Sequence, residues 1–213
     1  MKKDLLKLVA GFRKFRDRFF QEEGSVFTRL SSQGQRPKTL MIACSDSRVD
    51  PAILFSTSPG EVFVVRNVAN LVPPFDSSDG YHGVSAAIEF AVVNLKVENI
   101  LVLGHRQCGG IRSLFIPEEQ NHGGYVSKWM NIAEPAKEKV IKNFPDADLD
   151  LQCKECEQIS ISISVKNLKT FPFILAAIKN RGLNIIGVYF DLEKGQLCYL
   201  DEVTDSFKDI PYL

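Results

Sequence analysis

Two short segments of the sequence carry residue types that bind metals and activate water. The first, Cys44-Ser-Asp-Ser-Arg48, follows an apolar run at residues 39–43, and the second, which contains His105 and Cys108, follows an apolar run at residues 99–103. In open parallel sheets, functional residues gather beyond the carboxyl ends of the strands, so we expect the two segments to converge. Together they offer two thiolates and one imidazole, a donor set that a catalytic zinc ion uses with water in its fourth position.

Asp46 and Arg48 follow Cys44 closely enough to assist such a metal. Zinc held by two thiolates and a neutral imidazole has no net formal charge, so it depends on its surroundings to acidify bound water. An ionised Asp46 could accept a hydrogen bond from zinc-bound hydroxide and orient it, and a bidentate pair with Arg48 would keep that carboxylate ionised. An ordinary ion pair in a loop is the alternative interpretation.

Other interpretations compete for the five cysteines, which are Cys44, Cys108, Cys153, Cys156 and Cys198. The two cysteines of the segments could be buried core residues, since free cysteine is often buried. Cys153 and Cys156 could instead complete a closed Cys3His structural zinc site with the second segment, but they lie on a helical stretch. No strand precedes this pair, which argues against a thioredoxin-like role. Cys198 is expected in the core, and His82 and His122 are expected to face solvent.

The remaining pattern favours a small, uncharged substrate. Phe63, Val68 and Phe90 could line an apolar pocket, although residues of these types are more often part of the core. Gly109-Gly110 lacks both the lysine of a phosphate-binding loop and the GxGxxG spacing of a dinucleotide site, and no other phosphate cradle follows a strand.

The elements that would position these residues form an α/β pattern. Short apolar runs suit parallel strands, and a helix is expected between the second and third of them. Pro172 should kink or split the longest helical stretch, and the last two runs resemble a hairpin, which predicts an antiparallel edge strand. The strands are expected at residues 39–43, 61–65, 99–103, 184–190 and 196–200, and the helices at 83–94, 111–115, 125–143 and 155–180.

The first 34 residues predict a helical arm. Apolar residues recur there at helical spacing, namely Leu5, Leu8, Val9, Phe12, Phe15, Phe19 and Phe20. This apolar stripe could pack on its own domain or on a partner chain. No linker divides the chain, so we expect one domain over residues 1–213, with an arm at 1–34 and a zinc-binding α/β core at 35–213.

Composition excludes several classes of function. Apolar residues make up 45% and charged residues 24%, as in ordinary globular proteins. Lys plus Arg equals Asp plus Glu at 26 each, which argues against a nucleic-acid binder because such proteins present a concentrated positive face. No run of about 18 apolar residues is present, and charges interrupt the N-terminal stretch, so we expect no membrane partner and a cytoplasmic location.

These residues resemble the β-class carbonic anhydrases, in particular the plant-like subclass. The similarity rests on the two metal-binding segments and on shorter motifs between them, and it covers about residues 30–200. The connecting motifs are Pro59-Gly-Glu61, Val65-Arg-Asn67, Ala69-Asn70, Val72-Pro-Pro74 and Ala86-Ala-Ile-Glu89. The resemblance implies reversible hydration of CO2 to bicarbonate and a proton through zinc-bound hydroxide.

The resemblance also implies roles for individual residues. Cys44, His105 and Cys108 would bind one zinc ion per chain, with Asp46 a fourth ligand only in a closed state. Asp46 and Arg48 would form the catalytic dyad. The substrate would contact Gln35, Phe63, Val68, Phe90 and Gly109.

The family dimerises by exchanging N-terminal helices, so the resemblance implies a homodimer or homotetramer with the arm clasping a partner. Met41 replaces a tryptophan that is typical of the bicarbonate-regulated subclass, so we expect the open, water-liganded state. Two alternatives remain: hydrolysis of carbon disulfide or carbonyl sulfide on the same scaffold, and a non-catalytic, zinc-stabilised interaction protein.

Overall fold

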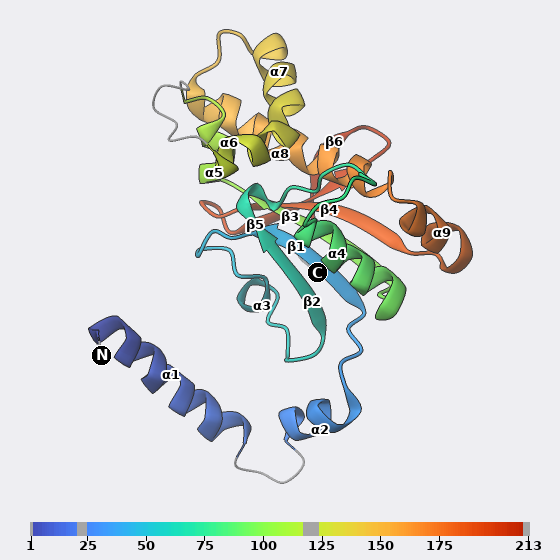
Figure 1. Ribbon diagram of the computed structural model, residues 1–213. Coiled ribbons are helices and arrows are strands. Elements are labelled where there is room, and N and C mark those ends of the chain that lie inside the picture. The colour runs from blue at the N-terminus through green and yellow to red at the C-terminus, as the bar shows by residue number, and fades with distance from the viewer. Residues whose placement is uncertain (1, 21–24, 117–123, 211–213) are drawn as a thin grey trace.

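The computed structural model describes residues 2–20, 25–116 and 124–210, and its centre is a six-stranded sheet (Figure 1). The strand order is β2-β1-β3-β4-β5-β6. The first four strands in this order are parallel, and the last two pairs are antiparallel. The strands are β1 Thr39–Cys44, β2 Val62–Asn67, β3 Asn99–His105, β4 Asn184–Asp191, β5 Gln196–Asp201 and β6 Ser206–Asp209. The expected mostly parallel α/β sheet is confirmed, with two antiparallel strands at the edge where one was expected.

The described helices connect and cover these strands. They are α1 Lys3–Phe19, α2 Val26–Gln33, α3 Pro51–Leu54, α4 Gly83–Glu89, α5 Gly109–Ser113, α6 Tyr125–Met130, α7 Glu134–Asn143, α8 Leu149–Leu168 and α9 Pro172–Arg181. A π-helical turn at Phe90–Asn94 extends α4, and 3-10 turns lie at Val68–Asn70 and Asn131–Ala133. The predicted break at Pro172 is present, since α8 and α9 meet at an angle of 81°.

The two faces of the sheet are covered unequally. On one face, Leu40 and Ile42 of β1 lie in the main core with apolar residues of α4, α8 and α9. Ala43 lies on the opposite face in a much smaller cluster, to which Leu54 of the one-turn helix α3 contributes. Val64 of the edge strand β2 is exposed. The second face is therefore only thinly covered by the described residues of the chain.

The arm is helical, as expected, but it lies apart from the sheet. In Figure 1, α1 projects away from the domain and is reached through α2. No residue of α1 is buried, and Leu8 and Phe12 are 71% and 60% exposed. The described aromatic residues of the arm pack on one another, through ring contacts among Phe12, Phe15, Phe19, Phe20 and Phe27. Packing of the apolar stripe on the chain's own core is not observed.

No single described helix is long and apolar enough to cross a membrane. The pair α8 and α9 would reach that length and composition together, but it is bent, and both helices contribute buried residues to the core.

Candidate metal centre

Three potential metal ligands converge at the carboxyl edge of the sheet. Cys44 is the last residue of β1 and His105 the last residue of the neighbouring parallel strand β3, while Cys108 immediately precedes α5. The two sulfur atoms lie 3.9 Å apart, and the three donor atoms all lie within 4.8 Å of one another. The expected convergence of the two strand ends is confirmed.

The His105 ring is oriented so that one nitrogen faces the two thiols. Its Nδ1 lies 2.9 Å from the backbone carbonyl of Arg106, to which it donates in the tautomer that leaves Nε2 with a lone pair. Nε2 is buried and has no hydrogen-bond partner among the described residues. A buried nitrogen in this state, beside two buried thiols, fits a metal ion that accepts all three donors.

The electrostatics of the three groups also fit a metal. The hydrogen bond between the two thiols lowers the pKa of Cys44 to about 4 and raises the pKa of Cys108. Burial lowers the pKa of His105, but the charges of Cys44 and Asp46 and the hydrogen bond to the Arg106 carbonyl oppose this effect, and the net shift is upward. Metal binding requires deprotonated thiols, and the hydrogen bond between the two thiols already favours the thiolate form of Cys44.

Asp46 and Arg48 lie directly beside the three donors as a bidentate pair. Arg48 Nε donates to Asp46 Oδ1 over 3.0 Å, and Nη2 donates to Oδ2 over 2.7 Å. The Arg48 backbone N–H also donates to Oδ1. These hydrogen bonds hold the pKa of Asp46 well below its usual range. Asp46 Oδ2 lies 4.0 Å from His105 Nε2, so an ionised oxygen faces the point where the donors converge.

Arg48 donates hydrogen bonds to both carboxylate oxygens of Asp46. In this arrangement Asp46 is not a metal ligand. The role of Asp46 as a fourth ligand in a closed state stays a prediction.

Arg66 on β2 holds the loop that carries Cys44 and Asp46, a role that the sequence reasoning missed. Its guanidinium donates to the backbone carbonyls of Cys44 and Asp46 over 3.0 and 2.7 Å, and to the carboxylate of Asp50 over 2.8 Å. Asp50 in turn caps the N-terminus of α3. The motif Val65-Arg-Asn67 signalled this residue, but the register that brings β2 beside β1 was needed to identify its partners.

Val68 and Gly109 lie near the predicted metal ligands. Val68 directly follows β2, whose last residue pairs with Cys44, and Gly109 directly follows Cys108. Val68 begins a tight turn in which Ala69 has a φ of 62° and Asn70 a φ of 48°. The indole of Trp129 donates to the Val68 carbonyl over 2.8 Å. Helix α5 packs closely on this turn, because a Cβ at Gly110 would lie 2.8 Å from the Val68 side chain. Val68 remains 37% exposed and is therefore available to a ligand.

Gln35, Phe63 and Phe90 lie elsewhere in the protomer. In the β1–β2 register, Phe63 pairs with Leu40, four residues before the level of Cys44, which corresponds to about 13 Å along the strand. Phe90 packs against Phe63, with ring centroids 5.8 Å apart. Gln35 is exposed and precedes β1, whose carboxyl end carries Cys44. Within one chain, the residues predicted to line the substrate pocket therefore fall into two separate groups.

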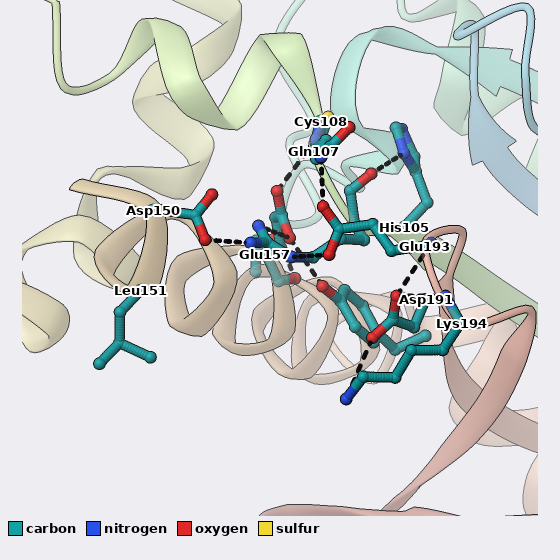
Figure 2. Close-up of polar contacts among 12 residues, drawn as sticks. His105, Gln107, Cys108, Asp150, Leu151, Glu157, Asp191, Glu193 and Lys194 are labelled. Atoms are coloured by element: carbon teal, nitrogen blue, oxygen red, sulfur yellow. Dashed lines mark hydrogen bonds and ion pairs between the residues drawn. The ribbon is translucent and has the colours of Figure 1, made fainter. Parts of the chain in front are cut away.

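A buried polar network lies behind the metal centre, and sequence reasoning missed it entirely. Glu157 of α8 accepts from the Cys108 backbone N–H over 2.9 Å and from the Tyr189 hydroxyl over 2.8 Å (Figure 2). Arg106 approaches Glu157 to 3.9 Å and also pairs with Asp150. Burial raises the pKa of Glu157, although these partners oppose the shift. No local pattern distinguishes a buried glutamate on a helix from a solvated one.

The other cysteines stay outside the centre. Cys153 and Cys156 are buried on α8, and the group of potential metal ligands found among the described residues does not include them. Their buried position favours a core role over a closed Cys3His site. Cys198 is partly exposed and donates to Asp209, so the expectation of a core position is wrong. His82 is partly exposed, and His122 lies outside the described residues.

Comparisons with known proteins agree with this geometry. The family model of carbonic anhydrase matches residues 39–197. Beta carbonic anhydrase 3 of Arabidopsis thaliana is 35% identical over 192 residues, which cover 89% of this chain and 74% of that protein. The structure of the β-carbonic anhydrase CcaA is similar with a TM-score of 0.90 and 31% identity, covering 99% of this chain and 94% of that one. A chain from the tetrameric β-carbonic anhydrases of Sordaria macrospora is similar with a TM-score of 0.76 and 31% identity, covering 92% and 93%.

Proposed function

The chain belongs to the β-carbonic anhydrase family, and we propose that it catalyses the reversible hydration of CO2 to bicarbonate and a proton with one zinc ion per chain. The observation that carries the proposal is the convergence of Cys44, His105 and Cys108 within 4.8 Å, beside an Asp46 carboxylate held by Arg48. This site combines a place for a Lewis acid with an oriented anionic acceptor.

Zinc is the metal that the donor set favours. Thiolate and imidazole ligands in a group of three are typical of catalytic zinc, whereas magnesium and calcium prefer oxygen donors. When bound, zinc supplies a Lewis acid that makes a water molecule nucleophilic at neutral pH. Cys44, His105 and Cys108 would hold it, with the His105 ring fixed by the Arg106 carbonyl.

The protein's own contribution is orientation of the attacking water. While it is ionised, Asp46 accepts hydrogen bonds and cannot donate them, and the hydrogen bonds from Arg48 keep it ionised. The carboxylate would therefore accept a hydrogen bond from the attacking water or hydroxide. This hydrogen bond would leave an oxygen lone pair directed at CO2. Val68 offers an apolar surface beside this point, which suits an uncharged substrate.

We further propose that the active protein is a homo-oligomer. Phe63 and its neighbour Phe90 lie away from the metal centre of their own chain, and Gln35 precedes the far end of β1, so we propose that these residues serve the centre of a second chain. The exposed apolar residues of α1 and the thinly covered face of the sheet supply surface for such an assembly. The tetrameric relatives from Sordaria macrospora support the same proposal.

The deciding experiment is an assay of CO2 hydration by the zinc-replete protein, with carbon disulfide and carbonyl sulfide as competing substrates. Activity on CO2 that disappears on chelation and returns with zinc is expected. Hydrolysis of a sulfur analogue without CO2 hydration would assign the chain to the first alternative. Zinc-replete protein without activity on any of the three would favour a non-catalytic role, against which the Asp46–Arg48 pair argues.

A further inference from the structure

Glu157 is a buried acidic residue that contacts the metal centre from behind. It lies in the middle of α8 and is 2% exposed. Its Oε1 accepts from the backbone N–H of Cys108 over 2.9 Å, and its Oε2 accepts from the Tyr189 hydroxyl over 2.8 Å. Figure 2 shows Glu157 and Cys108, with the hydrogen bonds of this group drawn as dashed lines. Both oxygens are therefore used, and one of them reaches a predicted metal ligand.

A buried arginine lies near the Glu157 carboxylate. Arg106 Nη1 lies 3.9 Å from Glu157 Oε2, and the Arg106 side chain is only 7% exposed. The same guanidinium pairs with Asp150 and approaches Glu193 to 3.8 Å at the surface. Burying a carboxylate without such partners costs folding free energy. Because Glu157 is nevertheless buried next to the loop that carries Cys108, we expect it to have a specific role there.

The Cys108 backbone needs an external partner. Residues 105–108 leave β3 through a sharp turn in which Gln107 has a φ of 60°, a left-handed conformation that is uncommon for a residue with a side chain. Cys108 then precedes α5, so its N–H lies outside the hydrogen-bond ladder of that helix. Glu157 supplies the acceptor, and close packing of α8 on β3 permits it, since a Cβ at Gly104 would lie 2.4 Å from the Ile161 side chain.

We propose that Glu157 is a positioning residue for metal binding, whose reach to the Cys108 N–H fixes the direction of the Cys108 thiolate. The inference rests on the proposed function, because it concerns the same metal centre. It assigns a role in metal affinity to a residue that contacts neither the metal position nor the substrate. Replacing a residue that forms a hydrogen bond to a metal ligand typically lowers metal affinity or activity by about 10- to 100-fold.

Two substitutions separate the reach of Glu157 from its charge. Glu157→Gln keeps the length of the side chain, and its amide oxygen can still accept from Cys108 while its NH2 donates to the Tyr189 oxygen. Glu157→Asp keeps the charge but withdraws the carboxylate by one carbon–carbon bond, about 1.5 Å. Ser162→Ala is the matched control, because Ser162 is buried on the same helix and donates to Asp205, away from the ligand loop.

The measurement is the zinc dissociation constant, obtained by competition with a chromophoric chelator. The thiolate-to-metal absorption of the cobalt-substituted protein provides a second readout that is independent of activity. We expect Glu157→Asp to weaken zinc binding by about 10-fold or more and to shift the cobalt absorption. We expect Glu157→Gln and Ser162→Ala to bind zinc within about threefold of the wild type.

Wild-type affinity in the Asp variant would overturn the inference, as would an equal loss in the Ser162→Ala control. A loss in the Gln variant without one in the Asp variant would overturn it too, because charge and not reach would then matter. A wild-type protein that binds no zinc would overturn the proposed function together with this inference. The two failures are therefore distinguishable.

Discussion

Arg48 Nη2 donates to the backbone carbonyl of Gln107 over 3.0 Å, while the same guanidinium holds the carboxylate of Asp46. Arg48 Nη1 also donates to the Gln107 side chain over 3.4 Å. Gln107 lies between His105 and Cys108, so one side chain joins the loop after β1 to the loop after β3. Arg48 is therefore expected to stabilise the geometry of the metal centre as well as the ionisation of Asp46.

Substitution of Arg48 tests this double role. Arg48→Ala removes the hydrogen bonds that depress the pKa of Asp46, so that pKa should rise toward its ordinary value of about 3.9. We expect activity to fall on the order of 10- to 100-fold at neutral pH, with a further loss below about pH 5 as Asp46 takes up a proton. The check is a pH profile of CO2 hydration with zinc content measured at each pH. Arg48→Lys keeps the positive charge but loses the bidentate geometry of the guanidinium, so its activity should lie between those of the wild type and Arg48→Ala. A wild-type pH profile for Arg48→Ala would contradict the double role.

Asp46→Asn tests the orienting carboxylate alone. The amide has nearly the same shape, but it can present N–H donors where a lone pair is required. By analogy with loss of one oriented catalytic hydrogen bond, turnover is expected to fall about 100- to 1,000-fold. Zinc content should remain at one per chain, because Asp46 is not among the converging ligands. If Asp46→Asn keeps both its zinc and near-normal turnover, the orienting role does not hold.

The ligand assignment is tested by metal analysis of two serine variants. Cys44→Ser removes one of the three converging donors, so we expect loss of zinc and of activity. Cys153→Ser is the matched control, because Cys153 is also a buried cysteine but lies outside that group. Retention of zinc by the first variant and its loss from the second would point to a different metal site.

Assembly is tested by sedimentation and by mixing two defective chains. We expect at least a dimer at micromolar concentration, and a folded, fully active monomer would contradict the proposal. Gln35→Ala chains lack a pocket residue, and Cys44→Ser chains lack a ligand, so each should be impaired alone. Random mixing should restore about a quarter of wild-type activity, since half of the dimers are mixed and each holds one intact site. Activity no higher than the average of the separate variants would show that each chain builds its pocket alone.

The predictable part of the site is the part that depends on local sequence. The apolar runs that end in Cys44 and His105 predict parallel strands, and parallel strands bring their carboxyl ends together. The partners of Asp46 are likewise close along the chain, since Arg48 follows it by two residues. These features follow from rules that act over a few residues.

The rest depends on contacts between distant parts of the chain. Glu157 lies 49 positions from Cys108, and its burial results from the packing of α8 on β3 rather than from any local pattern. Strand β6 is short, with exposed and partly exposed residues, so it lacks the apolar run that marked the other strands. Helix α1 ends at Phe19 and a second helix, α2, follows within the arm, a division that the helical spacing of apolar residues in this segment does not mark.

The most direct test of the central claim is the rate of CO2 hydration by the zinc-replete wild-type protein, measured beside its zinc-free form and Asp46→Asn at matched protein concentration. The account predicts rapid hydration only in the zinc-replete wild type, recovery of the zinc-free form when zinc is returned, and a zinc-bound but severely impaired Asp46→Asn. A wild-type protein that holds one zinc per chain yet hydrates CO2 no faster than buffer would contradict it.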